Sequence, residues 1–237
     1  MNIVKQITDE FRLLENEEQK VVLSRFFKTG KGEYGEGDIF LGVKVPKIHL
    51  LVKKYWQQTQ LTDLQKLITS SCHEIRLYTL LDLVKKFQRS NDEDQKRTFV
   101  DFYLANTKHI NNWDLVDLSC YKILGSYLLD KDRKILYSLA KSENFWEQRI
   151  AMVSCMEFVH HNQFDDCLAI AEILQNHPND LIQKAVGWLL REVGKRNEET
   201  LTNFLSTRYK TLPRTTLRYA IEKFSPEVRK KYLKGEM

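Results

Sequence analysis

The chain has 237 residues, 42% of them hydrophobic and 29% charged, so it can build a sizeable core and is neither disordered nor collagen-like. It contains only four prolines and nine glycines, and five of the glycines fall between residues 30 and 42. Long helices joined by short turns fit this distribution, and we predict an all-α fold.

The net charge of +5 is placed unevenly along the chain. Residues 208–234 hold nine Lys and Arg against two Glu, a local net charge of +7, so the rest of the chain carries −2. Such a tail can meet a polyanion, because basic side chains bind phosphates, or it can be a solvated cationic helix. Both interpretations stay open from the sequence alone.

The four cysteines indicate buried free thiols rather than disulfides or zinc, because they form no CxxC pair and sit in apolar helical contexts. The chain has no apolar run of 18 residues, and its N-terminus lacks a signal-peptide core. We therefore expect a cytoplasmic protein with no membrane partner, no metal site and no cofactor. The cysteines are Cys72, Cys120, Cys155 and Cys167.

The N-terminal part, residues 1–58, is predicted to contain helices interrupted by a Gly-rich loop. Residues 3–28 have helical periodicity, with a second apolar stripe that contains Val21, Val22, Phe26 and Phe27. Residues 29–38 cannot form a stable helix and are predicted to be a loop or a short hairpin, with Tyr34 at its centre. The spacing of a phosphate-binding P-loop is absent, which excludes that kind of nucleotide site.

Pro46 is predicted to begin the next helix, where its missing N–H costs nothing. Lys47, Lys53 and Lys54 lie on its outward side. The start of this helix, with Lys47 beside it, is either a binding site for a phosphate or a capped surface helix.

From residue 60 onward a pattern repeats. Four copies can be aligned by eye, near Cys72, Trp113, Trp146 and Leu181, and a weaker fifth surrounds residues 214–220. The aligned positions 76, 117, 149 and 184 lie 41, 32 and 35 residues apart, a period typical of HEAT or armadillo helix pairs. Second helices are expected near residues 131–140 and 164–175.

This pattern predicts a single domain over residues 1–237, with repeats and a basic C-terminal helix in 59–237. We expect a right-handed curved solenoid of HEAT-like antiparallel helix pairs with one concave, DNA-binding face. The repeats cap themselves, so a monomer is expected.

The aligned row reads Arg76, Asp117, Arg149 and Lys184. A row of basic side chains would follow a phosphate backbone. A carboxylate within that row would repel the phosphates and weaken binding, so its presence indicates a catalytic role for Asp117. The alternative is a salt bridge from Asp117 to Arg149 that joins two repeats. We also expect Arg191 to contact DNA along the same face.

Two tryptophans share faces with this row. Trp113 lies one turn before Asp117 and Trp188 one turn after Lys184, whereas Trp146 is expected in the core. Two indoles beside a carboxylate can contact a sugar or a base and exclude water.

Three segments together resemble the bacterial DNA alkylation repair family, the AlkD-type alkylpurine DNA glycosylases built from HEAT-like repeats. They are Trp113–Asp117, Trp146–Arg149 and Gln183–Glu192, and Phe40-Leu41-Gly42 with Pro46 is similar to the family's N-terminal part. The resemblance covers roughly residues 5–225. Phe26 stands where the best-known members have a tyrosine.

The resemblance implies an enzyme that excises cationic N3- and N7-alkylated purines from double-stranded DNA without a base-flipping pocket. It assigns the family's carboxylate to Asp117, its two sugar-facing tryptophans to Trp113 and Trp188, and a groove arginine to Arg149. The alternative is a non-catalytic HEAT-repeat protein that binds damaged or branched DNA. A protein-interaction solenoid is disfavoured, because it would not need basic residues aligned around one Asp.

Overall fold

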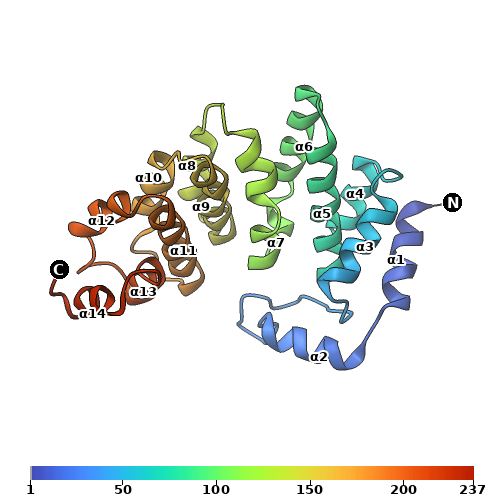
Figure 1. Ribbon diagram of the computed structural model, residues 1–237. Helices are drawn as coiled ribbons and strands as arrows, with labels where there is room; N and C mark the ends of the chain where they lie inside the picture. Colours follow the sequence, from blue (N-terminus) through green and yellow to red (C-terminus); the bar gives the residue numbers. More distant parts are fainter. Residues whose placement is uncertain (1) are drawn as a thin grey trace. The chain divides into compact units, whose positions relative to one another are not determined.

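In the computed structural model, which describes residues 2–237, the chain is built from helices (Figure 1). The all-α prediction is confirmed, since the only strand-like pairing among these residues is one isolated bridge between Ile39 and Cys72. The helices form two compact units, unit 1 ending at Ser119 and unit 2 comprising Cys120–Met237. Whether they make one continuous repeat domain stays a prediction.

Unit 1 is organised around α5, against which α3, α4, α6 and α7 pack. Every residue from His73 to Val84 in this helix is buried, as expected for a helix surrounded by others. The helices of the unit are α1 (Ile3–Leu13), α2 (Glu17–Phe26), α3 (Val45–Tyr55), α4 (Leu61–Ile68), α5 (His73–Arg89), α6 (Glu93–Ala105), the short η1 (Thr107–His109) and α7 (Trp113–Asp117).

The predicted helical stretch 3–28 is two helices, separated at residues 14–16. Asn16 ends the break, because its side chain caps α2 by accepting a hydrogen bond from the Gln19 N–H at 2.8 Å. The N–H of Asn16 donates to the Leu41 carbonyl at 2.9 Å, which ties the start of α2 to the segment after the Gly-rich loop.

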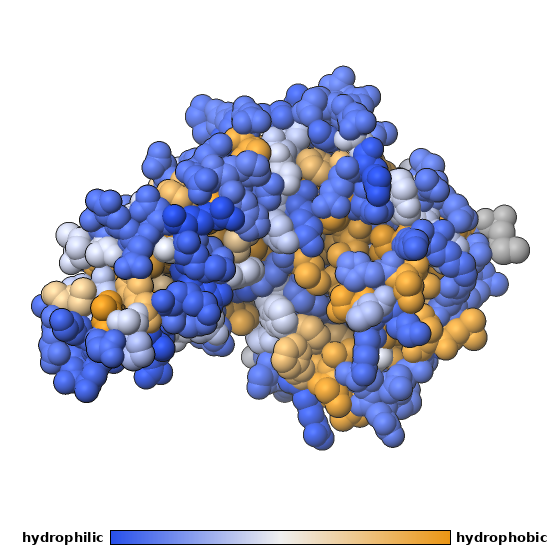
Figure 2. Space-filling model, viewed as in Figure 1, coloured by the Kyte–Doolittle hydropathy of each residue, from blue (hydrophilic) through white to orange (hydrophobic). Residues whose placement is uncertain are grey.

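The second apolar stripe does not face the core. Val21, Val22 and Phe26 of α2 are half exposed or more, as is Leu50 of α3, and hydrophobic surface lies open over this part of unit 1 (Figure 2). Only Phe27, one residue beyond α2, is buried. The spacing of apolar residues correctly predicted the helix α2, but it did not predict which face of that helix is buried.

The Gly-rich segment is a loop, and it contains no strand. Its own acidic side chains fold it: Glu33 accepts a hydrogen bond from the Gly30 N–H at 2.8 Å, and Glu36 accepts one from the Gly32 N–H at 2.7 Å. These two carboxylates therefore accept hydrogen bonds from the backbone of the loop itself.

Unit 2 is organised around α9 and α11. Every residue from Arg149 to Met156 of α9 is buried, and Trp146 is buried as expected. Its elements are the π-helix η2 (Tyr121–Gly125), α8 (Lys134–Ala140), α9 (Phe145–His160), α10 (Asp165–Leu174), α11 (Asp180–Arg196), α12 (Glu198–Ser206), α13 (Arg214–Ala220) and α14 (Pro226–Lys234). All four cysteines of the chain are buried free thiols, as predicted.

Gly187 allows the close crossing of α11 and α13. A Cβ atom added there would lie 2.5 Å from the Tyr219 Cβ and 2.6 Å from the Thr216 carbonyl oxygen. This contact places the α11 face that carries Lys184 and Trp188 in a defined position within unit 2.

The segment after the Gly-rich loop is held by a buried carboxylate. Glu74 of α5 accepts hydrogen bonds from the N–H groups of Leu41, Gly42 and Val43 at 3.0, 2.8 and 3.1 Å. Gly42 has a φ of +80°, and a Cβ on it would lie 2.2 Å from the Asn16 carbonyl oxygen. The position requires glycine for both conformation and space.

Replacing Gly42 by alanine should lower the free energy of unfolding by more than about 3 kcal/mol, because steric overlap adds to a left-handed strain of about 1–2 kcal/mol. Gly32→Ala is the matched control, since Gly32 has a φ of +78° and no atom within 4 Å of an added Cβ. It should show only the strain of about 1–2 kcal/mol. Urea unfolding measures both, and equal losses would contradict the close approach at Gly42.

Candidate nucleic-acid interface

Helix α7 carries two of the predicted catalytic residues, Trp113 and Asp117, one turn apart and therefore on one face. Both residues are partly exposed, whereas Leu115 and Val116 between them are fully buried. The buried Asn112 caps the helix by accepting a hydrogen bond from the Trp113 N–H at 2.9 Å. The core thus fixes which side of α7 remains accessible.

The other end of α7 is anchored as well. The hydroxyl of Ser119 is buried, donates to the Leu115 carbonyl, and lies 3.1 Å from the hydroxyl of Tyr103 on α6. A five-residue helix is too short to be stable alone, so these anchors determine its orientation.

A buried network of charged side chains meets the start of α7. The imidazole of His73, the first residue of α5, lies between two carboxylates: its Nδ1 is 3.2 Å from Asp38 and its Nε2 is 2.8 Å from Asp114. Asp38 also accepts hydrogen bonds from the Arg76 guanidinium at 2.7 Å and from the Asn111 amide at 3.0 Å. The network joins the Gly-rich loop, α5 and α7.

The carboxylates keep His73 protonated. Burial by itself disfavours the charged imidazole, but the charge and hydrogen bond of Asp114, together with the hydrogen bond to Asp38, outweigh it and raise the pKa of His73 from 6.5 to about 9. Burial likewise tends to raise the pKa of Asp38, and the hydrogen bond from His73 and the charge of Arg76 lower it. Two cations therefore balance two carboxylates in the interior of unit 1.

Aromatic rings support Trp113 from beneath. Its indole stacks on Phe27 with centroids 5.3 Å apart and meets Phe26 edge-on at 5.8 Å. Phe27 stacks in turn on Phe40 at 5.2 Å, and Phe40 stacks on the His73 ring at 4.6 Å. The same imidazole that binds Asp114 thus supports the stack under Trp113.

The expectation that Arg76 contacts DNA is wrong for this structure. The side chain is buried, at 4% exposure, and its guanidinium donates to Asp38, to the Asn111 side chain at 2.9 Å and to the Ser70 carbonyl at 2.8 Å. No face of it is left for a phosphate, and its role is to neutralise Asp38.

The helix caps explain the error as a one-residue shift in the alignment. Asp117, Arg149 and Lys184 each lie five residues after the N-cap of their helix, whereas Arg76 lies four after the N-cap of α5. The residues that correspond to Arg76 are glutamines. Each donates a side-chain hydrogen bond to the backbone carbonyl six residues earlier, as Arg76 does to Ser70. These pairs are Gln148 with Ser142 at 2.7 Å and Gln183 with His177 at 2.9 Å.

Unit 2 carries the remaining members of the predicted row. Arg149 is buried at 5% exposure and donates to the Leu181 carbonyl, which links α9 to the first turn of α11. Lys184 is partly exposed and pairs with Asp180 at 2.7 Å, and Trp188 is also partly exposed. Their DNA contacts stay predictions.

Arg191, also on α11, is less available to bind a phosphate than Lys184. Its guanidinium forms ion pairs with Glu222 and with Glu192, the latter at 3.4 Å. A phosphate would have to displace or share these carboxylates.

The three lysines of α3 are exposed, as expected. Lys54 pairs with Glu10 of α1. The N-cap residue of α3, Lys44, provides no side-chain cap, and Pro46 lies in the first turn as predicted. The phosphate seat beside Lys47 stays a prediction.

Comparison with known proteins identifies the family. The family model described as DNA alkylation repair enzyme matches residues 7–224. The chain belongs to the DNA alkylation repair enzyme family.

A solved structure described as a predicted DNA alkylation repair enzyme from Enterococcus faecalis has the same fold. Its TM-score is 0.70, with 19% sequence identity, over 90% of this chain and 97% of that one. No curated protein matches the chain.

In this DNA alkylation repair enzyme family member, the basic tail contributes open cations to unit 2. Five of its exposed basic residues form no ion pair within residues 2–237. They are Lys210, Arg214, Arg218, Lys230 and Lys231.

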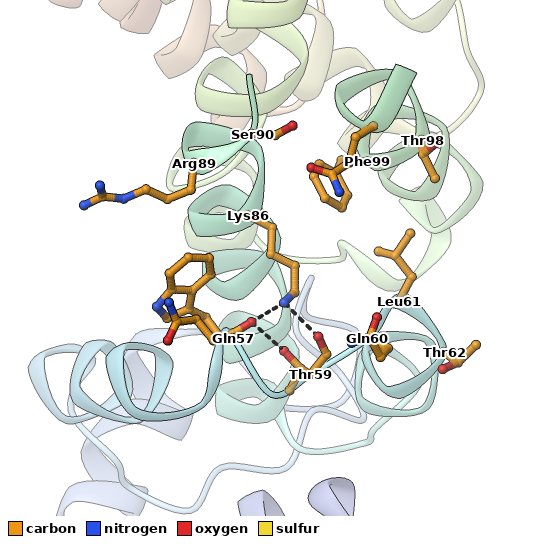
Figure 3. A pocket seen from close by; sticks show the side chains of 12 residues that line it. Gln57, Thr59, Gln60, Leu61, Thr62, Lys86, Arg89, Ser90, Thr98 and Phe99 are labelled. Atoms are coloured by element: carbon orange, nitrogen blue, oxygen red, sulfur yellow. Dashed lines mark hydrogen bonds between the residues drawn. The ribbon is translucent and has the colours of Figure 1, made fainter. Parts of the chain in front are cut away.

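A separate cavity of about 780 Å³ lies in unit 1 between the α3–α4 turn, the end of α5 and α6 (Figure 3). Its lysine is already satisfied, since the Lys86 ammonium donates to the carbonyls of Trp56 and Thr59 and lies 3.4 Å from Asp82. None of the predicted site residues lines it.

No group of three or more His, Cys, Asp or Glu side chains in residues 2–237 is arranged to hold a metal ion. None of the helices described has the length and apolar content to cross a bilayer.

Sequence reasoning assigned no role at the site to Asp38, His73, Asn111 or Phe27. Their neighbours along the chain are loop or helix residues with no shared motif, and the partners of Asp38 lie 35 to 73 residues away. One signal was present: His73 and Arg76 are charged residues in a segment otherwise apolar enough to be core.

The network predicts pH-dependent stability. A pKa raised from 6.5 to about 9 stabilises the fold by roughly 3 kcal/mol while His73 is protonated in both states, and this contribution disappears as pH rises through 9. The stability difference between wild type and His73→Gln should therefore be largest below pH 6.5 and shrink by pH 10. Urea unfolding across this range measures it, with the exposed His49→Gln as control; a constant difference would contradict the charged pair.

Proposed function

We propose that the chain is a DNA glycosylase that hydrolyses the N-glycosidic bond of cationic N3- or N7-alkylated purines in double-stranded DNA. Family membership supports a role in the repair of alkylated DNA. The observation that carries the finer proposal is α7, which holds an indole and a carboxylate one turn apart on a short helix anchored at both ends.

The chemistry requires little beyond an anion. An alkylated purine is already a cationic leaving group and needs no general acid, while positive charge develops on the deoxyribose in the transition state. A carboxylate about 4 Å from that charge contributes up to about 4 kcal/mol at an intermediate dielectric, or roughly 1,000-fold in rate. Asp117 supplies this anion and positions the attacking water.

Trp113 and Trp188 are proposed to contact the sugar and exclude water around it. In this mechanism the damaged base is not drawn into a pocket, which is the usual route of glycosylases. Lys184 and Arg191 of unit 2 and Lys47, Lys53 and Lys54 of unit 1 are proposed to bind phosphates, together with the exposed cations of α13 and α14. Arg149 is not included, because it is buried and bonded to the α11 backbone.

The second candidate is a protein that binds damaged or branched DNA without cleaving it. The Gly-rich loop gives this candidate no support as a DNA clamp, because Glu33, Glu36 and Asp38 outnumber Lys28 and Lys31, and the loop folds on itself and onto α5. Catalysis distinguishes the two candidates.

Asp117→Asn should reduce the release of N3-methyladenine and N7-methylguanine from alkylated DNA by about 100- to 1,000-fold, because the amide cannot stabilise the cationic sugar. Single-turnover assays with released base quantified by chromatography measure the effect. Asp101→Asn, at an exposed position on α6, is the control for loss of one carboxylate. Equal release by wild type and Asp117→Asn would refute the catalytic role, and no release by wild type would favour the binding protein.

Lys184→Gln should weaken binding of undamaged duplex at low salt and reduce the slope of log K against log salt by about one, because one phosphate contact is lost. Lys184 is preferable to Arg149 for this test, since Arg149 also bonds the α11 backbone. Lys141→Gln, at an exposed lysine of the same unit, should change neither quantity. An unchanged slope for Lys184→Gln would remove this residue from the DNA surface.

A further inference from the structure

We propose that Asp38, His73 and Asp114, with Arg76 and Asn111, form a clamp through which the Gly-rich loop positions Trp113 and Asp117 for base release. We call these five residues the His73 clamp. The inference rests on the proposed function, and none of the five is assigned a contact with DNA; they are positioning residues.

The clamp joins three segments that are distant in sequence. Asp38 ends the Gly-rich loop, His73 begins α5, and Asp114 lies in the first turn of α7, so one imidazole bonds the segments before and after it. Asn111 adds a second link, because its side chain contacts both Asp38 and Arg76 just before the cap of α7.

The position of α7 depends on these links. The helix has only five residues, and the turn at residues 118–119 separates it from the helical residues that begin at Cys120. Asp114 lies between the two proposed catalytic residues of α7, and the His73 ring also supports the aromatic stack under Trp113. A change at His73 therefore reaches Trp113 by two routes.

Charge balance makes the clamp sensitive to protonation. The charged groups that face the imidazole are Asp38 from the loop, Asp114 from α7 and Arg76 from its own helix. Glu74 is one residue away but is bonded to the N–H groups of residues 41–43, and the Cys72 thiol donates to Glu74. When His73 loses its proton, two buried carboxylates keep only Arg76, and one of them becomes an uncompensated buried charge.

The titration of His73 should therefore change both the rate of base release and the fluorescence of Trp113. In wild type, single-turnover base release and the fluorescence of Trp113 should change together with a midpoint near pH 9, where His73 deprotonates. The fluorescence of Trp113 is obtained as the difference between wild type and Trp113→Phe. This wild-type measurement needs no clamp variant to fold.

Asp38→Asn removes one of the two carboxylates, so both transitions should move to lower pH by roughly one pH unit or more. His73→Gln should abolish both transitions and lower the rate of base release by about 10- to 100-fold through misplacement of α7, with the affinity for undamaged duplex unchanged.

Asp166→Asn is the matched control, because Asp166 forms a half-buried ion pair of the same 2.7 Å length with Arg133 in unit 2. It should lower stability without moving either transition. If Asp38→Asn lowers stability but leaves both midpoints in place, the clamp is only structural and the proposal is overturned. If wild type releases no base, the proposed function fails, and the Trp113 fluorescence transition alone still decides whether the clamp positions α7.

Discussion

The imidazolium of His73 between two buried carboxylates is the interaction on which unit 1 depends. A charge in the interior is tolerated only when partners surround it, and here the partners come from a loop, from α5 itself and from α7. Satisfying that one charge therefore fixes three segments relative to one another. The burial of Leu115 and Val116 selects the accessible face of α7, with Trp113 and Asp117, and the bond from His73 to Asp114 holds the start of that helix in place.

The Gly-rich loop has a definite physical role in this arrangement. Its glycines allow tight turns, and two of its carboxylates close those turns by accepting backbone N–H groups. Asp38 is the residue that connects the loop to the core. The loop therefore contributes a residue to the buried network behind Trp113. Its acidic side chains accept hydrogen bonds from groups within the protein, and this accounts for its acidic composition without a ligand.

The repeats have two adjacent positions with different roles. Four residues after the cap, Arg76, Gln148 and Gln183 reach back to a carbonyl and hold the preceding turn. Five residues after the cap lie Asp117 and Lys184, which are proposed to act on DNA, and the buried Arg149. Within unit 2, Gly187 permits α13 to cross α11 closely, which orients the side of α11 that bears Lys184 and Trp188.

The sequence by itself determined the helical class, the Gly-rich loop, the buried thiols and most helix positions, because periodicity and helix breakers are local properties. It also indicated that Trp113 and Asp117 share one face of α7, since spacing along one helix defines a face. Tertiary structure alone decided the exposed side of α2, the burial of Arg76 and the bonds among Asp38, His73 and Asp114. The sequence does not show whether a charged side chain faces solvent or pairs with a residue 35 positions away. Only the packing of distant segments decides which of these environments it has.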